Sequence, residues 1–339
     1  MRVLNIDGLY FVEPLRKAGC DVLSLGPSDE CDVPLQQPLS LKKLWALLER
    51  RNFRPDLVLW CDVCRLPSVI GFEALPAVTV GLSIDQYCNP WHYPYSAAFD
   101  LLLAAQKDYL PFFRLAGIDR EARWAPLFCD PSTDRDLGLM RDVPVGFVGT
   151  LKGSINKERL PFLQAFKRGC PLVLQQGAYA ELFSRCRIVL NQSAAGELNF
   201  RLFQAQACGA AMLTEDVENG LRDLYEPGKD ILVYPRGDAS AAARVAREAL
   251  AWDGLEGLAR AGRRKALREH SAPARVRMIL REVESLAKNG APRRRLANLP
   301  RIRAELAKAY TMIAHDEGLP IPAEQRKFYA ELGLRTLGG

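Results

Sequence analysis

Three features are scarce in this sequence: long apolar runs, histidine and acidic metal-binding pairs. No apolar run approaches the roughly 18 residues that a membrane-spanning helix requires, and no leader-like segment precedes the first predicted strand. We therefore expect a cytoplasmic protein. Histidine occurs only three times in 339 residues, and no Asp-x-Asp pair flanked by apolar strand residues is evident. The lack of such an acidic pair suits a metal-free mechanism, and we expect neither a metal site nor another cofactor.

Cysteine occurs nine times, an odd number without the spacing of a disulfide framework. The one Cys-x-x-Cys pair, Cys61 and Cys64, follows an apolar strand and has no second pair at metal-ligand spacing. We expect reduced, buried thiols and neither a zinc site nor a redox centre.

Positive charge is concentrated towards the C-terminus. The net charge is +6, and the residues from Ser285 onward include ten basic and five acidic side chains, so the rest of the chain is nearly neutral. A nearly neutral body argues against a nucleic-acid-binding surface. The basic tail is compatible with contact to an anionic membrane surface or an acidic partner, although a solvated helix face explains the same pattern.

Strand and helix patterns alternate in two successive sets, which predicts two parallel-sheet α/β domains. The predicted strands are 3–6, 21–25, 57–60, 77–82, 101–105 and 123–126 in the first set, and 145–148, 172–174, 187–190, 211–213 and 231–233 in the second. We predict an N-terminal Rossmann-like domain at 1–130, a polar linker at 131–143, a C-terminal Rossmann-like domain at 144–290 and a basic helical extension at 291–339.

The most informative stretch is LNQSAAGELNFRLFQAQACGAAMLTED, residues 190–216. It predicts the end of a strand, a polar loop, a helix at 200–208 that stops at Gly209, and another strand. A loop that enters a helix at the carboxyl edge of a parallel sheet presents N–H groups to anions. Arg201, in the first turn of that helix, adds a guanidinium suited to phosphate. The alternative is an ordinary surface helix that carries Arg201 and Gln204.

The segment QAQACGAAMLTED resembles the second half of the Glu-x7-Glu segment of GT-B glycosyltransferases. The longer pattern, LN, then a loop, then RLF, is similar to the CgeB-type (spore-maturation) branch of that superfamily. The resemblance implies an α/β protein of the GT-B fold: two Rossmann-like, doubly wound parallel-sheet domains facing a cleft, with extra C-terminal helices. In that superfamily the second Glu binds the ribose of a nucleotide sugar. Here Gln204 stands at that position, and Gly196 stands at the first, with Glu197 beside it.

A second candidate phosphate site is FVGTLKGSINKER, residues 147–159. Backbone N–H groups at 149–151 can point at an anion, and Lys152, Lys157 and Arg159 can neutralise its charge. The segment also resembles the CgeB-type pattern of FVG followed by Arg and an apolar helix, which implies donor-diphosphate binding by Gly149, Thr150 and Arg159. The full set of expected donor-binding residues is Gly8, Gly149, Thr150, Lys157, Arg159, Asn191, Arg201 and Gln204.

The N-terminal domain carries the closest textual match. The segments AQKDYLPFFRLAGI and WAPLFCDP, within residues 105–131, look like CgeB-type segments, and IDQYCNPWHYPYSAAFD, residues 84–100, resembles the IDTH stretch of that family. Asp85 matches the Asp of that stretch. The adjacent His has no counterpart, and the nearest histidine is His92.

An acceptor hydroxyl is a poor nucleophile until a carboxylate or imidazole removes its proton. Asp85 follows a strand end, where an α/β domain binds its ligands, and is the first candidate for this catalytic role. His92 is the second candidate, with a histidine packed among aromatic rings as the alternative. Gly8, in the turn after the first strand, resembles the glycine loop of GT-B first domains, with a lone turn glycine as the alternative.

These resemblances favour a metal-independent glycosyltransferase of the hexosyltransferase type. It would move a sugar from a nucleoside-diphosphate sugar to a hydroxyl acceptor on a polysaccharide, a protein or a small molecule. Arg159 and Arg201 would stabilise the departing diphosphate electrostatically. The alternatives are a nucleotide-sugar epimerase of the same architecture, against which the scarcity of histidine argues, and a non-catalytic nucleotide-sugar-binding protein.

Overall fold

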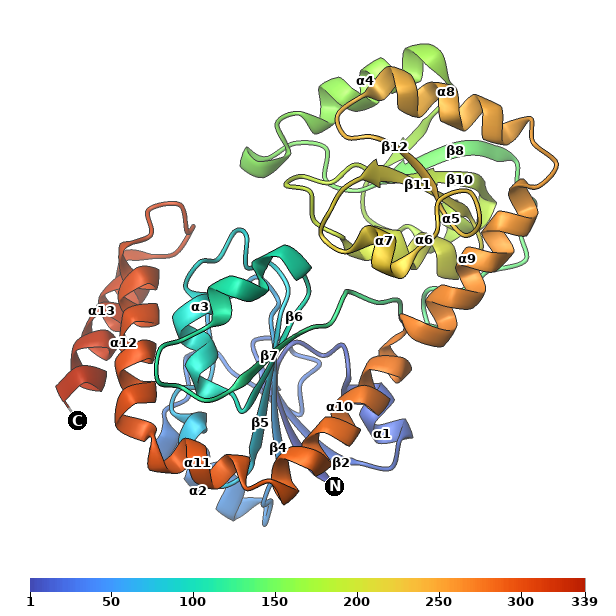
Figure 1. The fold of residues 1–339 in the computed structure, drawn as a ribbon. Helices are drawn as coiled ribbons and strands as arrows, with labels where there is room; N and C mark the ends of the chain where they lie inside the picture. The colour runs from blue at the N-terminus through green and yellow to red at the C-terminus, as the bar shows by residue number, and fades with distance from the viewer. Residues whose placement is uncertain (339) are drawn as a thin grey trace. The chain divides into compact units, whose positions relative to one another are not determined.

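A computed structural model describes residues 1–338, apart from the side chains at positions 154, 337 and 338. The chain forms two compact units. Unit 1 consists of Met1–Ala125 together with Val276–Gly339, and unit 2 consists of Pro126–Arg275. Each unit has its own parallel sheet with helices around it (Figure 1).

Unit 1 is built on a seven-stranded sheet of order β3-β2-β1-β4-β5-β6-β7, in which all neighbours are parallel. Every residue of the central strand β4 is buried, as expected for a strand with helices on both faces of its sheet. The strands are β1 (Arg2–Asp7), β2 (Asp21–Gly26), β3 (Val33–Pro34), β4 (Leu57–Cys61), β5 (Val78–Ser83), β6 (Leu101–Ala104) and β7 (Glu121–Trp124).

The helices of unit 1 come from both ends of the chain. Those from the N-terminal part are α1 (Val12–Lys17), α2 (Leu41–Arg50), α3 (His92–Tyr95) and the 3₁₀ segments Phe72–Ala74, Ser96–Ala98 and Lys107–Phe113. Those from the C-terminal part are α10 (Ala272–Lys288), which begins in unit 2, α11 (Ala291–Ala297), α12 (Leu299–His315) and α13 (Ala323–Gly338). Helix α12 packs on α3 and α13, and its Leu306 and Tyr310 share one buried cluster with Trp60 of β4.

A buried ion pair attaches the C-terminal segment to the sheet of unit 1. Arg295 of α11 is only 5% exposed and bonds Asp100, which immediately precedes β6. The same guanidinium donates to the carbonyl oxygens of Leu75 (2.7 Å) and Ala77 (2.8 Å). These contacts explain why the C-terminal residues form part of unit 1.

Unit 2 has a five-stranded parallel sheet of order β12-β11-β10-β8-β9. Its core joins strand residues such as Val145 and Ile188 to the apolar faces of α4 and α8. The strands are β8 (Val143–Val148), β9 (Val173–Gln175), β10 (Cys186–Leu190), β11 (Ala211–Asp216) and β12 (Leu232–Pro235). The helices are α4 (Arg159–Gly169), α5 (Ala180–Arg185), α6 (Phe200–Ala207), α7 (Leu221–Leu224), α8 (Ala239–Leu250) and α9 (Leu255–Glu269).

The compact units differ from the predicted domain boundaries. Residues 131–143, the predicted linker, are part of unit 2, where buried Asp134 accepts a hydrogen bond from the Tyr179 hydroxyl (2.7 Å) and Arg141 donates to the carbonyl oxygen of Cys186 (2.7 Å). Residues 276–290 and the predicted extension 291–339 complete unit 1. The two Rossmann-like sheets and the C-terminal helices are confirmed, and the expected cleft between the domains stays a prediction.

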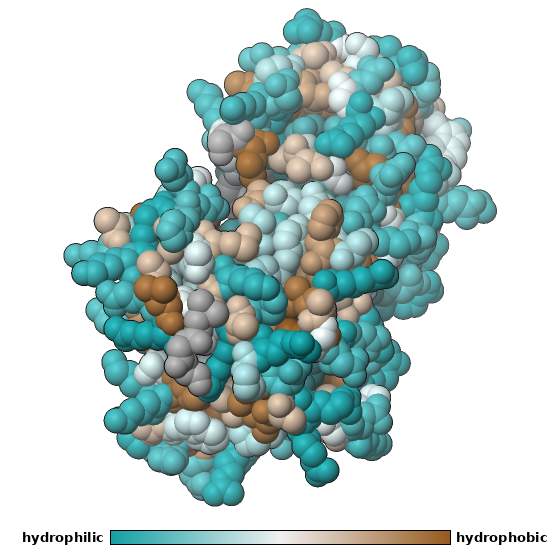
Figure 2. Space-filling model, turned by 60° about the vertical axis from the view of Figure 1, so that its left-hand side comes forward, coloured by the Kyte–Doolittle hydropathy of each residue, from teal (hydrophilic) through white to brown (hydrophobic). Residues whose placement is uncertain are grey.

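The face of the molecule shown in Figure 2 is largely hydrophilic, with apolar residues in small separate patches. No helix within residues 1–338 combines the length and the apolar character needed to cross a membrane.

Candidate functional site

The candidate site lies in unit 2, at the carboxyl edge of the sheet. Strands β8, β10 and β11 are parallel neighbours, so the loops after them leave the same edge of the sheet. The loop after β10 enters α6 at Phe200, and α4, the first α-helix after β8, begins at Arg159. Helix α6 ends as predicted, with Gly209 in the left-handed conformation (φ +87°).

Arg201, in the first turn of α6, extends towards the end of β8. Its Nε donates to the carbonyl oxygen of Val148 (2.7 Å), and its Nη1 donates to the Oδ1 of Asn191 (2.6 Å). The guanidinium lies over the ring of Phe147, 4.3 Å from its centroid. No protein acceptor is found for Nη2 in residues 1–338, so its two N–H groups remain for a ligand.

Arg159 reaches the same place from the start of α4. It is 5% exposed, and its Nε and Nη1 donate to the Oε1 of Gln192 (2.8 Å) and the carbonyl oxygen of Thr150 (2.9 Å). Its guanidinium also lies over Phe147, at 5.8 Å. The structure therefore brings the two predicted arginines together over one aromatic ring.

This arginine pair concentrates positive charge. The oxygen acceptors of Arg201 are carbonyl and amide groups, and no carboxylate forms a salt bridge with it in the described part of the chain. Burial lowers the pKa of Arg201 to about 9, and the charge of Arg159 adds to this shift. Two cations held together in this way favour an anion with more than one negative charge.

Gly149 provides the space that Arg201 occupies. A Cβ at this position would collide with Nη2 of Arg201, so a glycine is needed for the observed arrangement. The expected backbone cradle at 149–151 is only partly available, because the Gly149 N–H donates to Gln175 (3.2 Å) and the Leu151 N–H to Gln176 (3.3 Å). The side chains, more than the turn amides, define this site.

Asn191 and Thr214 position Arg201 from the neighbouring strands. Asn191 is 2% exposed, and its Nδ2 donates to the Thr214 hydroxyl (2.9 Å), which turns Oδ1 towards the guanidinium. The Tyr234 hydroxyl donates to the carbonyl oxygen of Asn191 (2.6 Å). Asn191 is therefore buried beneath the arginines as a positioning residue.

The loop at 191–199 is held by two carboxylates of the chain itself. Glu197 accepts from the N–H groups of Ala194 (3.0 Å) and Ala195 (2.7 Å), and Glu215 accepts from the N–H and hydroxyl of Ser193. These three N–H groups are therefore already paired within the chain and are not open to an anion, contrary to the expectation for this loop. Anion binding by the two arginines stays a prediction.

The side chain of Gln204 bonds residues other than those that hold Arg159 and Arg201. Its Nε2 donates to the Tyr179 hydroxyl (2.9 Å), which in turn donates to Asp134 (2.7 Å). A ribose contact by Gln204 stays a prediction. Lys152 and Lys157 are exposed. In residues 1–338, no contact of either lysine with Arg159 or Arg201 is found.

In unit 1, Asp85 lies beyond the end of β5 and is half-buried. Its carboxylate accepts a hydrogen bond from the Cys64 thiol, and its N–H donates to Asp62 (3.0 Å). Asp62 is fully buried after β4 and also accepts from the N–H groups of Cys64 and Ile84. Asp62 was not among the predicted site residues, although its position directly after an apolar strand, like that of Asp85, is a usable signal in the sequence.

His92 is 1% exposed and packs edge-on against the rings of Trp91 and Trp60. Its Nδ1 lies 2.9 Å from the Ser83 hydroxyl and 3.9 Å from Asp62. Burial lowers its pKa. This is the aromatic-packed arrangement named as the alternative, and a catalytic role for His92 stays a prediction.

Gly8 makes a tight crossing beside β4. Its N–H donates to the carbonyl oxygen of Cys61 (2.9 Å), and a Cβ would contact Cys61 and Tyr10 at 2.9 Å. The left-handed residue of this turn is Asp7 (φ 69°), which accepts from Trp60 Nε1 (2.8 Å). Burial raises the pKa of Asp7 to about 6. Close packing thus accounts for the glycine, and donor contact by Gly8 stays a prediction.

The nine cysteines are free thiols in this structure, and six of them are buried. Cys61 is buried. Cys64 is exposed as a residue, but the surrounding protein partly desolvates its thiol, and this desolvation together with the charge of Asp85 raises the pKa of that thiol. Across residues 1–338, no group of three or more His, Cys, Asp or Glu side chains is arranged to hold a metal ion.

Comparisons with known proteins agree with this architecture. Residues 167–281 match a family model described as Glycosyl transferase-like. Comparison with curated proteins gives no match.

Three solved structures with the same fold illustrate the comparison, and each has low sequence identity to this chain. A glycosyltransferase from Rickettsia africae ESF-5 has a TM-score of 0.63 and 11% identity, over 85% of this chain and 98% of that one. Anabaena Alr3699/HepE in complex with UDP-glucose has a TM-score of 0.61 and 14% identity, over 84% and 100%. Sucrose-phosphate synthase from Thermosynechococcus elongatus has a TM-score of 0.57 and 13% identity, over 84% and 99%.

The family-model match covers the loop after β10, Arg201 and the strand that follows α6, and it begins after Arg159. The resemblance to GT-B enzymes inferred from short motifs is thus supported by the match and by the fold. The chain has the GT-B fold, and the residues that match the glycosyl transferase-like family model, 167–281, lie mostly in unit 2.

Proposed function

We propose that this protein is a glycosyltransferase that moves a sugar, specifically a hexose, from a nucleoside-diphosphate sugar to a hydroxyl acceptor without a metal ion. The observation that carries the proposal is the arginine pair, in which Arg159 and Arg201 meet over Phe147 at the carboxyl edge of the sheet. The Anabaena structure, solved in complex with UDP-glucose, supports a nucleotide sugar as the donor class. The matches to CgeB-type segments support assignment to that branch.

In the proposed reaction, the bond between the anomeric carbon and the diphosphate oxygen breaks, and a bond from the acceptor oxygen to that carbon forms. Negative charge then develops on the departing nucleoside diphosphate. Two guanidiniums that are already desolvated and positioned stabilise that charge with little reorganisation. Asp85 is the proposed acceptor of the proton that leaves the hydroxyl.

The proposal is tested by measuring binding and turnover of UDP-, GDP- and dTDP-sugars. Replacing Arg201 with Gln should weaken donor binding by about 10- to 100-fold, because charge-assisted hydrogen bonds to phosphate contribute about 1.5–3 kcal/mol. The matched control is Arg260→Gln, at an exposed arginine on α9 that pairs with Glu256, which should leave binding unchanged. Equal donor affinity in both variants would remove Arg201 from the diphosphate site.

Turnover distinguishes the alternatives. Slow release of free sugar from the donor in the presence of a chelator supports metal-independent transfer. Conversion of one nucleotide sugar into another would indicate an epimerase. Binding without either reaction would indicate a non-catalytic protein, the alternative that Gln204 in place of a carboxylate keeps open.

A further inference from the structure

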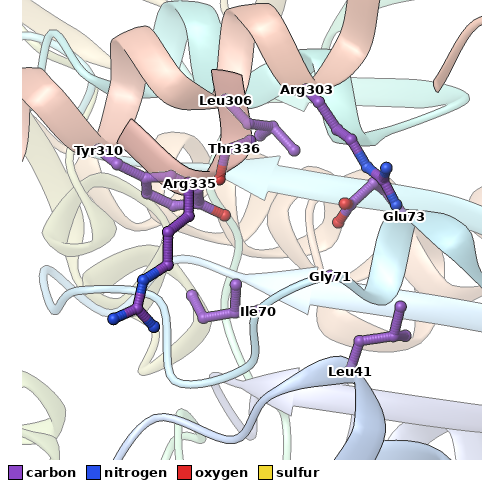
Figure 3. A pocket seen from close by; sticks show the side chains of 9 residues that line it. All are labelled: Leu41, Ile70, Gly71, Glu73, Arg303, Leu306, Tyr310, Arg335 and Thr336. Carbon is purple, nitrogen blue, oxygen red and sulfur yellow. The ribbon is translucent and has the colours of Figure 1, made fainter. Parts of the chain in front are cut away.

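A separate pocket, lined by both apolar and charged side chains, lies in unit 1, beside the 3₁₀ segment Phe72–Ala74 and helices α12 and α13 (Figure 3). Its volume is about 230 Å³. This is room for one small organic molecule, since a water molecule takes about 30 Å³. Leu41, Ile70 and Leu306 form apolar walls, and none of the residues in this pocket belongs to the arginine pair or to the surroundings of Asp85.

Glu73 is the unusual residue of this pocket. It is 5% exposed, and its carboxylate points into the cavity towards the hydroxyl of Tyr310 (Figure 3). In the described part of the chain no side-chain hydrogen bond to this carboxylate is found, and its charge is offset only at longer range by Arg303 and Arg295. Burying a carboxylate with so few donors is costly, so a ligand that supplies donors would be stabilised there.

The backbone around Glu73 is held firmly. Arg295 donates to the carbonyl oxygen of Glu73 (2.9 Å). Two residues earlier, Gly71 has a positive φ of +89°, and a Cβ there would lie 2.8 Å from Cβ of Leu41. The pocket is thus preformed, because neither the segment nor its neighbours can shift freely.

The charges around the cavity select the class of ligand. The negative charge of Glu73 would repel an anionic ligand. The positive charges of Arg303 and Arg335, which also line the cavity, would repel a cationic one. A neutral ligand that both donates and accepts hydrogen bonds satisfies every group: its hydroxyls donate to Glu73 and accept from Arg303. The Tyr310 hydroxyl can do either.

We propose that this pocket binds a neutral polyhydroxylated molecule of the size of one monosaccharide. The apolar walls of Leu41, Ile70 and Leu306 face the C–H surface of the sugar, and Glu73 and Arg303 bind its hydroxyls. The site does not depend on the proposed transfer reaction. It would give the protein a sugar-binding site in unit 1 in addition to any donor site in unit 2.

The experiment is ligand-observed NMR with D-glucose, D-galactose, D-mannose and N-acetylglucosamine, on protein carrying Arg201→Ala so that the candidate donor site is removed. Two further changes act on the pocket: Glu73→Leu removes the acceptor, and Ile70→Trp fills the cavity. Each should weaken sugar binding at least about tenfold. Glu73→Leu removes hydrogen bonds to a charged group, for which a loss of this size is expected. Ile70→Trp occupies the space of the sugar. Glu324→Gln, an exposed change on α13, should leave binding unaffected.

Stability is measured in parallel. Glu73→Leu should not lower the melting temperature, because it removes a buried charge, so lost binding cannot be attributed to unfolding. The proposal is overturned if no sugar binds, or if sugars bind both pocket variants as well as the parent protein. It is also overturned if methylammonium or glycine, but no sugar, binds in a manner that requires Glu73.

Discussion

Arg201 occupies the space that a side chain at position 149 would need. The two residues are 52 positions apart in sequence, on α6 and at the end of β8, and only a glycine at 149 lets the guanidinium bond the carbonyl oxygen of Val148 (2.7 Å). The contact makes this glycine part of the candidate anion site, because it leaves room for the Arg201 guanidinium.

Replacing Gly149 with Ala should therefore weaken donor binding without unfolding the protein. The new methyl group displaces the end of a flexible side chain, not the backbone, so we expect a loss of about 1–2 kcal/mol in stability at most. Calorimetry with nucleoside diphosphates should show at least a fivefold weaker Kd, roughly 1 kcal/mol. The matched control is Gly257→Ala on α9, where a Cβ meets nothing within 4 Å. Undiminished affinity in Gly149→Ala would show that Arg201 need not lie where it does.

Donor binding should also depend on alkaline pH. The pKa of Arg201 is lowered to about 9, so the unliganded protein loses this charge above pH 9, while a bound anion raises the pKa in the complex. Affinity should be full below about pH 9 and fall by up to about tenfold per pH unit above it. The donor affinity of Arg201→Gln is measured over the same pH range as a control. This variant lacks the guanidinium, so any pH dependence that remains comes from other groups, such as the nucleotide itself. Identical pH profiles for the two proteins would contradict the prediction.

Asp85→Asn should reduce transfer while it leaves donor binding nearly intact. The amide keeps the shape of the side chain but cannot accept a proton, and general-base catalysis contributes about 10²- to 10⁴-fold in rate. Steady-state rates and the donor Kd are measured together. Asp119→Asn, an exposed change in the same unit, serves as the control. Wild-type rates in Asp85→Asn would reject it as the activating group.

Arg295→Met should destabilise unit 1 strongly. It leaves Asp100 buried without its cation and frees the carbonyl oxygens of Leu75 and Ala77, and breaking a buried pair in this way costs about 3–5 kcal/mol. Denaturant unfolding measures the loss. The neighbouring Arg294 is exposed, so Arg294→Met should change stability by less than about 0.5 kcal/mol. Similar unfolding midpoints for the two variants would mean that the ion pair does not hold the C-terminal segment.

The strands were predictable because buried parallel strands form short continuous apolar runs, such as LVLWC at β4. The unit boundaries were not, because the contact that decides them joins Asp100 to Arg295 across 195 positions and leaves no local pattern. Periodicity indicates that the C-terminal residues are helical, but it does not indicate which sheet they cover.

The candidate site, like the fold, could be predicted from the sequence only in part. Arg159 and Arg201 could be predicted from their places at helix starts after strands. Phe147 and Gln192, which bring the two guanidiniums together, could not, because a strand phenylalanine and a loop glutamine carry no signal by themselves. Lys157 looked equally suitable in sequence, yet it is exposed, since charge alone does not specify the direction of a side chain.

Because α11 and α12 complete unit 1, the order of synthesis matters for this chain. The ribosome releases every strand of the first sheet, and then all of unit 2, before Arg295 emerges to meet Asp100. Until then the nascent N-terminal sheet lacks the helix that carries Leu306 and Tyr310 into its core. Unit 2, which is continuous in sequence, can fold first, so loss of the residues from α11 onward should leave an intact unit 2 attached to an incomplete unit 1 that is exposed to chaperones and proteases.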